Sequence, residues 1–247
     1  MIPSPPTPLP TAPPAAPAPA PPDAPSLQIA SAAPAVAPVA RRSDLQLGRR
    51  LFHAANGVAI ASSYAALFTH TEVVHLFGTI ACLVYIVDRV RVAYPEALAR
   101  APWVNRLFFR ADEQFRESGM IPYAIAILLT ILTVPKAAAL IAIYTLALSD
   151  PLSAVVGIRW GRRRIVPGKS VEGSLAFLAA TALIAGAVLA RTAAPPAGTL
   201  AGTALLIGFA GAVFEMLPLR VDDNLTIPLF VGFTAWIVCA WLGIPIG

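Results

Sequence analysis

The chain has 247 residues, of which 57% are hydrophobic and only 13% charged, and its mean hydropathy is +0.71. An average soluble domain carries roughly 25% charged residues, so this chain has too few to cover a water-soluble protein of its size. A pI of about 9.7 is typical of nucleic-acid binders, but here the basic residues stand between long apolar runs. The composition therefore predicts an integral membrane protein and argues against a nucleic-acid partner.

The N-terminal segment differs in composition from the rest. Residues 1–40 hold 14 of the 25 prolines, mixed with alanine and serine, and carry a single charge, Asp23. Such a stretch buries too little apolar surface to offset its ordering entropy. We expect a disordered Pro/Ala-rich tail over residues 1–44 and one transmembrane domain over residues 45–247.

Apolar runs recur from Leu51 onward. They predict an all-α, polytopic transmembrane bundle of about seven spans, although some runs are shorter than the ~20 residues that a spanning helix needs. The predicted spans are 51–69, 72–88, 120–135, 137–158, 174–190, 198–215 and 225–244.

The basic residues predict the orientation of these spans. If the segment before the first span is cytoplasmic, all of the 18 lysines and arginines except Lys136 and Arg191 fall on the cytoplasmic side. This bias follows the positive-inside rule and indicates a cytoplasmic N-terminus. The same assignment places every polar cluster on the cytoplasmic side, so we expect the active site there, at the inner membrane of a bacterium.

The first polar cluster begins with Asp150, inside an otherwise apolar run. A carboxylate at mid-bilayer costs on the order of 3 kcal/mol and is usually functional. Pro151 follows, so we expect a kink or a break in the helix. Ala154, Gly157 and Gly161 share a helical face with Asp150, and small residues there let another backbone or a ligand approach the carboxylate. A structural Asp that caps the helix after the break is the alternative.

The second cluster is a basic loop from Arg162 to Ser174. The three arginines 162–164 are explained by orientation alone, whereas the Pro-Gly-Lys-Ser-Val-Glu-Gly-Ser stretch is not. A lysine beside the first backbone amides of a helix is suited to bind phosphate. A P-loop is not expected, because Arg163 stands where that motif needs glycine and no strand precedes the stretch.

The third cluster comprises Asp222, Asp223 and Asn224, just before the last span. Two acids and an amide are hard oxygen ligands of the kind that Mg²⁺ takes together with substrate phosphates, although adjacent acids are also common in solvated loops. Together with Asp150 and Lys169 on the same side, they indicate phosphoryl transfer to a membrane alcohol.

Three blocks carry a resemblance to the CTP-dependent polyprenol and lipid kinases, a group that comprises dolichol kinase, phytol kinase and a CTP-dependent diacylglycerol kinase. The first block, Arg49 to Gly57, resembles R-(K/R)-x-x-H-x-x-x-G. The second, Asp150 to Ser174, resembles D-x-x-A-x-x-x-G-R-x-x-G followed by K-(S/T)-x-E-G-(S/T), with Ser149 where the group often has glycine. The third, Asp222 to Pro228, resembles D-N-L-x-(I/L)-P.

The resemblance implies a kinase that transfers the γ-phosphoryl group of CTP to an isoprenoid alcohol or to diacylglycerol with Mg²⁺ as cofactor. The implied metal ligands are Asp150, Asp222 and Asp223. Residues implied to hold the nucleotide and its phosphates are Gly157, Arg159, Gly161, Lys169, Ser170, Gly173 and Asn224. Catalytic roles fall to Asp150, Lys169, Glu172, Asp223 and His53.

Several alternatives remain open on the sequence alone. Phosphatidate cytidylyltransferase shares the central pattern and also uses CTP, but its closing H-G-G motif is absent here. A membrane transporter is an alternative of another class, although no repeat is evident and the polar groups gather at one interface. No residue is clearly the general base: His53 and Glu215 are the candidates, and a hydrogen-bonded packing role is the alternative for His53. The loop over 89–119 either closes over the nucleotide or lies as an amphipathic segment at the interface.

Overall fold

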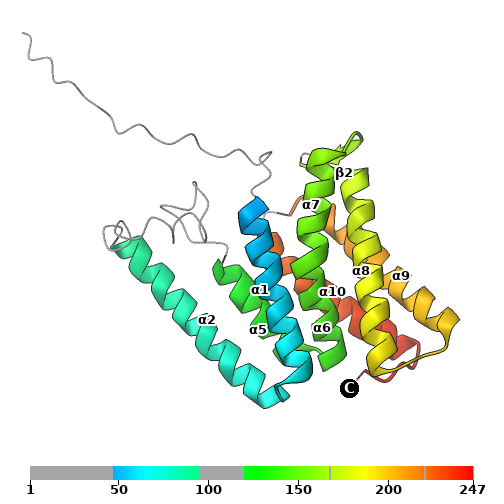
Figure 1. Cartoon of the computed structure of the whole chain (residues 1–247), viewed down its shortest axis with the longest axis horizontal. Coiled ribbons are helices and arrows are strands. Elements are labelled where there is room, and N and C mark those ends of the chain that lie inside the picture. Colours follow the sequence, from blue (N-terminus) through cyan, green and yellow to red (C-terminus); the bar gives the residue numbers. More distant parts are fainter. Residues whose placement is uncertain (1–46, 95–119, 167, 220, 247) are drawn as a thin grey trace, which may run out of the picture. The chain divides into compact units, whose positions relative to one another are not determined.

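The computed structural model describes residues 47–94, 120–166, 168–219 and 221–246. The predicted tail over 1–44, residues 95–119 of the predicted loop, and Arg220 lie outside these ranges. The described elements, in chain order (Figure 1), are α1 Leu47–Ala66, α2 His70–Ala93, α5 Met120–Thr133, α6 Lys136–Tyr144, the π-helical η2 Thr145–Ser149, α7 Asp150–Arg159, β1 Arg164–Val166, β2 Lys169–Ser170, α8 Val171–Thr192, α9 Ala197–Glu215 and α10 Asp223–Trp241.

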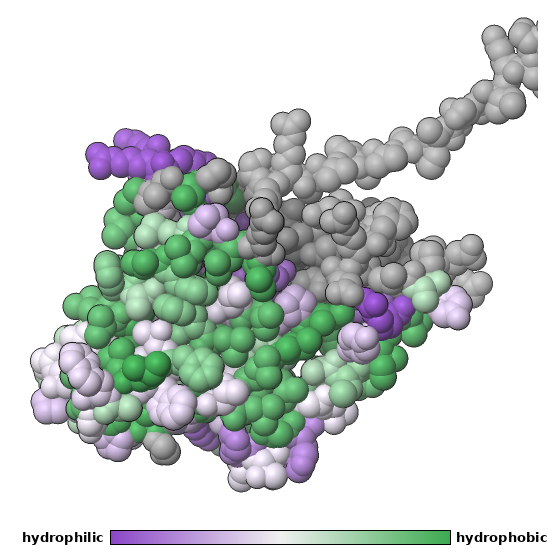
Figure 2. All heavy atoms as spheres, turned by 180° about the vertical axis from the view of Figure 1, so that it is seen from behind, coloured by the Kyte–Doolittle hydropathy of each residue, from purple (hydrophilic) through white to green (hydrophobic). Residues whose placement is uncertain are grey.

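Each predicted apolar run coincides with a helical segment of the described chain. Five of these described helices are long and apolar enough to cross a membrane: His70–Val90, Lys136–Arg159, Val171–Thr192, Ala197–Glu215 and Asp223–Trp241. The apolar part of α5, Ile121–Thr133, is shorter. Figure 2 shows hydrophobic residues over much of the visible described face, with hydrophilic ones toward its ends. The prediction of a helical bundle is confirmed, and five of its described helices are long and apolar enough for the predicted membrane location.

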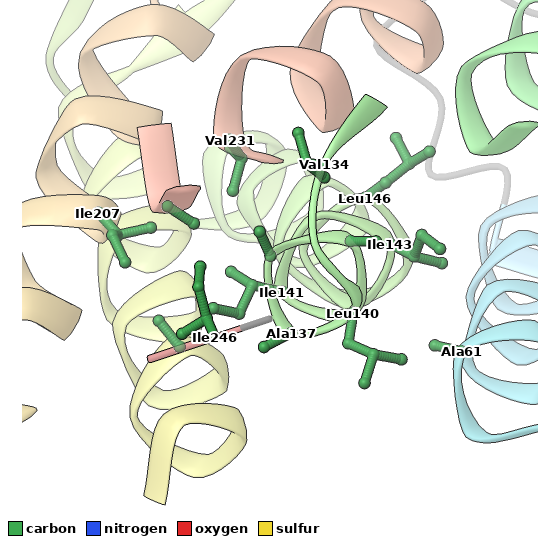
Figure 3. Close-up of a cluster of buried hydrophobic side chains, with 14 of the residues drawn as sticks. Ala61, Val134, Ala137, Leu140, Ile141, Ile143, Leu146, Ile207, Val231 and Ile246 are labelled. Atoms are coloured by element: carbon green, nitrogen blue, oxygen red, sulfur yellow. The ribbon is translucent and has the colours of Figure 1, made fainter. Parts of the chain in front are cut away.

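Helix α6 lies at the centre of the fold. It packs against α1, α5, α8 and α10, and every residue from Ala137 to Ile143 is buried. In Figure 3 its side chains point toward Ala61 of α1, Ile207 of α9 and Val231 of α10. The many alanines of α6 let neighbouring backbones approach closely, which is how helices pack where lipid replaces water.

The polypeptide passes from α6 to α7 without a break, so the helix break that Pro151 led us to expect as one possibility is absent. Instead the helix widens to the π-helix η2 over Thr145–Ser149, and the Asp150 N–H donates to the carbonyl of Thr145. Proline has no N–H to donate to the helix and clashes with the preceding turn, and a π-helical turn relieves that conflict. Ser149, the departure from the family pattern, is buried and accepts a hydrogen bond from Thr181 of α8 at 3.0 Å.

We expected no strand before the Pro-Gly-Lys-Ser stretch of the basic loop, and this expectation is wrong. β1 pairs antiparallel with β2, with Arg164 opposite Ser170 and Val166 opposite Lys169. Gly168 has a φ of +88°, which favours glycine, and so allows the turn between the strands. Two short strands in a hairpin are still unlike the buried parallel strand of a P-loop. The hairpin lies at the end of the helices where α7 ends and α8 begins (Figure 1).

Helices α1 and α2 form a hairpin whose arms diverge (Figure 1). The turn is fixed by Thr69, whose side chain accepts from the Glu72 N–H while Glu72 accepts from the Thr69 N–H, a capping box. From this turn α1 packs on α6, η2 and α7, whereas α2 packs on α5. Of the five candidate spans, His70–Val90 is the least buried by protein, at 17%.

Candidate active site

A cavity of about 920 Å³ brings together residues from all three sequence blocks, which are separated by up to 174 positions of chain. Arg50, His53 and Asn56 of α1 line it from the first block. The second block contributes Asp150, Ala154, Gly157, Lys169, Ser170, Gly173 and Ser174, and the third contributes Asp222, Asp223 and Asn224. The size is within the range of small-molecule sites.

Lys169 lies at the centre of the polar contacts in this cavity. Its ammonium donates to Glu215 at 2.5 Å and to Asp223 at 3.3 Å. The Glu215 carboxylate is nearly inaccessible, with 3% of its side chain exposed, and its other oxygen accepts from the Ser174 hydroxyl at 3.1 Å. Burial favours the neutral amine, but the nearby carboxylates outweigh it and raise the pKa of Lys169 above its ordinary 10.5. The cation is therefore fully present at neutral pH.

Asp150 lies opposite this cluster, at the start of α7. It interacts electrostatically with Lys169, Asp223, Glu215 and Arg50, so it belongs to one network of charges. Asp150 is half-buried and directed to the cavity, whereas the helix cap expected by the alternative reading is absent: Ser149 and Asp150 continue a helix. The carboxylate is thus available to a ligand of the cavity.

The third block starts α10. Asp222 is the N-cap and accepts from the Asn224 N–H at 2.8 Å, while Asp223 reaches Lys169. The N-terminus of α10, with its positive helix dipole, therefore points toward the cavity. Such an end favours negatively charged ligands such as phosphates.

The oxygen donors of the cavity fit Mg²⁺ in type and number. Asp150 and Asp223 face one space and Asp222 lies beside it. Within the described ranges no group of three or more His, Cys, Asp or Glu side chains is placed to hold a metal ion, so Asp150, Asp222 and Asp223 do not form the predicted three-carboxylate set. Mg²⁺ is usually held by one or two carboxylates, with water and substrate phosphates completing its shell. The arrangement therefore suits a metal that arrives with a nucleotide.

The glycines of the second block serve helix packing. A Cβ on Gly173 would lie 2.7 Å from the carbonyl oxygen of Ser153, and one on Gly157 would lie 3.0 Å from the Ser170 hydroxyl oxygen. That hydroxyl caps α8 by accepting from the Gly173 N–H at 3.1 Å. Of the two alternatives raised by the small residues, approach of another backbone is therefore realised between α7 and α8. This packing holds Asp150 and Lys169 across the same cavity.

Three predicted site residues do not line the cavity. Arg159 is exposed at the end of α7 and lies over the Trp160 ring at 5.3 Å. Gly161 packs against Gly157 and Ser170. Glu172 accepts at 3.4 Å from the N–H of Arg163, which fastens the hairpin to α8. Glu172 and Gly161 therefore contribute to the hairpin and its attachment, and Gly161 lies beyond the end of α7 and not on its face.

The cavity also has an apolar part that was not predicted. Side chains of α1, α2 and α5 line it, including Tyr123, whose ring lies 4.3 Å from that of His53. Tyr123 is 8% exposed, and its hydroxyl has no hydrogen-bond partner among the described residues. In the sequence, the only sign of this apolar part was Tyr123, an aromatic residue within the shortest predicted apolar run. Glu215 was expected as a candidate base, but its contacts with Lys169 and Ser174 make it a partner that positions the lysine.

The site thus combines an ammonium, a helix N-terminus, oxygen donors for a cation, and an apolar compartment. This set can bind a metal–polyphosphate beside an amphiphile. His53 lies where the polar and apolar parts meet, since it lines the cavity together with Arg50 and Tyr123.

Comparison with known proteins shows a similarity to a protein of uncharacterized function. The chain is 28% identical over 193 residues to an uncharacterized protein of Methanocaldococcus jannaschii, which covers 76% of this chain and 91% of that protein. The chain matches no protein-family model. No solved structure matches it.

Proposed function

We propose that this chain is a membrane kinase that transfers the γ-phosphoryl group of CTP to a lipid alcohol, an isoprenoid alcohol or diacylglycerol. The observation that carries the proposal is the single cavity in which Asp150, Lys169 and Asp223 meet across helices α7 to α10 and continue into apolar side chains. Phosphoryl transfer between a nucleotide and a lipid needs both compartments in one site. The three blocks that resemble the CTP-dependent lipid kinases all contribute to it.

In the proposed reaction the lipid hydroxyl oxygen attacks the γ-phosphorus in line. The new O–P bond forms as the bond from the γ-phosphorus to the β–γ bridging oxygen breaks, and CDP leaves with that electron pair. Mg²⁺, when bound, would neutralise charge on the phosphates, with Asp150 and Asp223 as its protein ligands and water and substrate phosphates completing its shell. Lys169 orients and neutralises the transferred group.

The proton of the attacking hydroxyl needs an acceptor within reach. We assign His53 to this role, because it lies between the charged and apolar parts of the cavity. Glu215 is less suited, since both its oxygens are engaged by Lys169 and Ser174.

Orientation and location are part of the proposal. Lys136 begins α6 and Arg191 lies in the last turn of α8, at the helix ends away from the β1–β2 hairpin. With the positive-inside rule this supports seven spans, including α1 and α5, with the N-terminus and the active site on the cytoplasmic face. We place the protein in a bacterial inner membrane.

The test is product analysis with a matched lysine pair. Purified protein is given Mg²⁺, γ-labelled CTP or ATP, and phytol, farnesol, undecaprenol or diacylglycerol. We expect label in a lipid monophosphate and a loss of rate of about 10²–10³-fold in Lys169→Gln, as when a charge-stabilising donor is removed, with Lys136→Gln near wild type. Asp150→Asn should also be inactive.

Two results would redirect the assignment. Pyrophosphate release with phosphatidate, without a labelled lipid monophosphate, would indicate a cytidylyltransferase. Solute flux through proteoliposomes without nucleotide consumption would indicate a transporter.

A further inference from the structure

A second cavity, of about 780 Å³, lies at the end of the helices away from the β1–β2 hairpin. Helices α1 and α8 both pack on α6 but scarcely on each other, so a groove remains between them over α6 (Figure 1). Its floor includes Ala137 and Leu140 of α6, which are buried, and Leu140 points between α1 and α8 (Figure 3). This cavity shares no lining residue with the candidate active site, so it is a separate site.

Two cations line this second cavity, and no acid does. They are Lys136, at the start of α6, and Arg191, in the last turn of α8. Among the described residues neither cation has a carboxylate partner. The Lys136 ammonium donates to the carbonyl oxygen of Ala65 at 3.5 Å and lies 5.0 Å from the centre of the Tyr64 ring. A carbonyl at that distance and an aromatic ring do not neutralise a cation, so the cavity is positively charged.

The usual reasons for placing a cation at a helix end do not account for this pair. The helix dipole favours Arg191 in the last turn of α8, but it disfavours Lys136 in the first turn of α6, where no acid compensates the charge. In the orientation proposed above, these two are also the basic residues that depart from the positive-inside rule. That both exceptions line one cavity points to an anion that they bind together.

The apolar part of the lining indicates what kind of anion this is. On α8, Ile184, Ala187 and Val188 line the cavity on the same helical face as Arg191. At 1.5 Å per residue this face extends roughly 10 Å from the arginine along the helix. The cavity is therefore charged near the helix ends and apolar further along α8, which is the order of headgroup and acyl chain in a lipid leaflet. A soluble anion would leave the apolar face uncovered, whereas a lipid covers it.

We propose that the cavity between α1, α6 and α8 binds an anionic phospholipid, with Lys136 and Arg191 on its phosphodiester and an acyl chain against α8. Phosphatidylglycerol has this chemistry because its headgroup carries a negative charge and no cation. Phosphatidylcholine has a quaternary ammonium in its headgroup, which the two cations would repel. Binding at this site requires neither a nucleotide nor a lipid alcohol, so the inference is independent of the proposed kinase activity.

The test is photolabelling of the full chain in phosphatidylcholine nanodiscs. Two probes are compared, phosphatidylglycerol and phosphatidylcholine with the same diazirine near the carbonyl end of one acyl chain, and labelled residues are mapped by mass spectrometry. We expect the phosphatidylglycerol probe to label Ile184 and Val188 about tenfold more than the phosphatidylcholine probe does. Leu183, which is 75% exposed and does not line the cavity, should be labelled equally by both probes.

Two competition experiments distinguish a lipid from a soluble anion. Excess unlabelled phosphatidylglycerol should remove the label from Ile184 and Val188, whereas excess inorganic phosphate should not. Equal labelling of these residues by the two probes would overturn the anionic preference. Removal of the label by inorganic phosphate as effectively as by phosphatidylglycerol would overturn the choice of a lipid.

Charge variants assign the headgroup contacts. Lys136→Gln and Arg191→Gln should each weaken the apparent affinity of the phosphatidylglycerol probe about fivefold, and the double variant about 25-fold, the scale for one cation near an anionic headgroup. Lys136→Arg keeps the charge and should label as wild type does. Arg162→Gln removes an exposed cation outside the cavity and should leave the labelling of Ile184 unchanged. An equal loss in Arg162→Gln and Arg191→Gln would indicate unspecific attraction and refute the site.

Discussion

The contact between Lys169 and Glu215 allows a quantitative test of the site. Lys169 has two carboxylate partners that differ in environment: the Glu215 side chain is 3% exposed and Asp223 is 46% exposed. A solvent-exposed ion pair contributes roughly 0–1 kcal/mol. A buried hydrogen bond to a charged group contributes about 1.5–3 kcal/mol. The two pairs should therefore differ in coupling free energy although they share one lysine.

Two double-mutant cycles measure this difference. The first combines Lys169→Met with Glu215→Gln, and the second combines Lys169→Met with Asp223→Asn. We expect a coupling of about 2 kcal/mol in the first cycle, because both the distance of 2.5 Å and the Ser174 hydrogen bond hold Glu215 in place. In the second cycle we expect less than about 1 kcal/mol.

The assay is reversible unfolding in mixed micelles of mild detergent and SDS, with the free energy of unfolding taken for each single and double variant. Glutamine preserves the shape of Glu215 and can still accept from Ser174, so the cycle reports mainly the charge. Couplings of equal size in the two cycles, or a larger one for Asp223, would refute the claim that burial of Glu215 fixes the lysine.

Three further predictions concern pH, packing and the hairpin. The pKa of Lys169 in the folded protein is above 10.5. Its stabilising charge should therefore be fully present below pH 10.5 and lost as the pH rises through the folded pKa. The difference in unfolding free energy between wild type and Lys169→Met should be constant from pH 7 to 10 and shrink above that. Gly208→Ala should lower the free energy of unfolding by about 1–3 kcal/mol, since its Cβ would lie 2.7 Å from the Leu178 carbonyl oxygen. The control, Gly202→Ala on the same helix, meets nothing within 4 Å and should be neutral or stabilising. Equal effects of the two substitutions would contradict the packing of α8 on α9. Gly168→Ala should cost about 1 kcal/mol, because its φ of +88° is unfavourable for alanine, and it should lower nucleotide turnover. An unchanged turnover rate would argue against the hairpin as the support of Lys169.

The sequence predicted the helices well because span length is a local property. Most of the apolar runs are long enough to cross lipid, and charges mark some of their ends, as at Arg159 and Asp223. Clustering of Asp150, Lys169 and Asp223 was expected only from their common side of the membrane, and the structure brings them into one cavity.

The misses concern features that depend on rotation and on neighbours. Glu172 and Gly173 are adjacent in sequence, yet only Gly173 lines the cavity, because consecutive helical residues point in different directions. The π-helix η2, just before Asp150, depends on packing against α1 and α8, which are distant in the sequence. Hydropathy does not show how a lipid-embedded helix is rotated or which helices it packs against, because the side chains that face lipid and those that face other helices are both apolar.

The enclosure of α6 has a consequence for biogenesis. Its residues from Ala137 to Ile143 are covered by helices on both sides of it in the chain, α1 and α5 before it and α8 and α10 after it. A growing chain that has released α6 into the bilayer therefore still lacks half of the shell around it. The core is completed only when α10 docks, so the Asp222–Asn224 corner of the site forms in the same event that closes the bundle. A nascent chain stopped before α10 would leave α6 partly uncovered for quality-control proteases and would lack the Asp222–Asn224 side of the cavity.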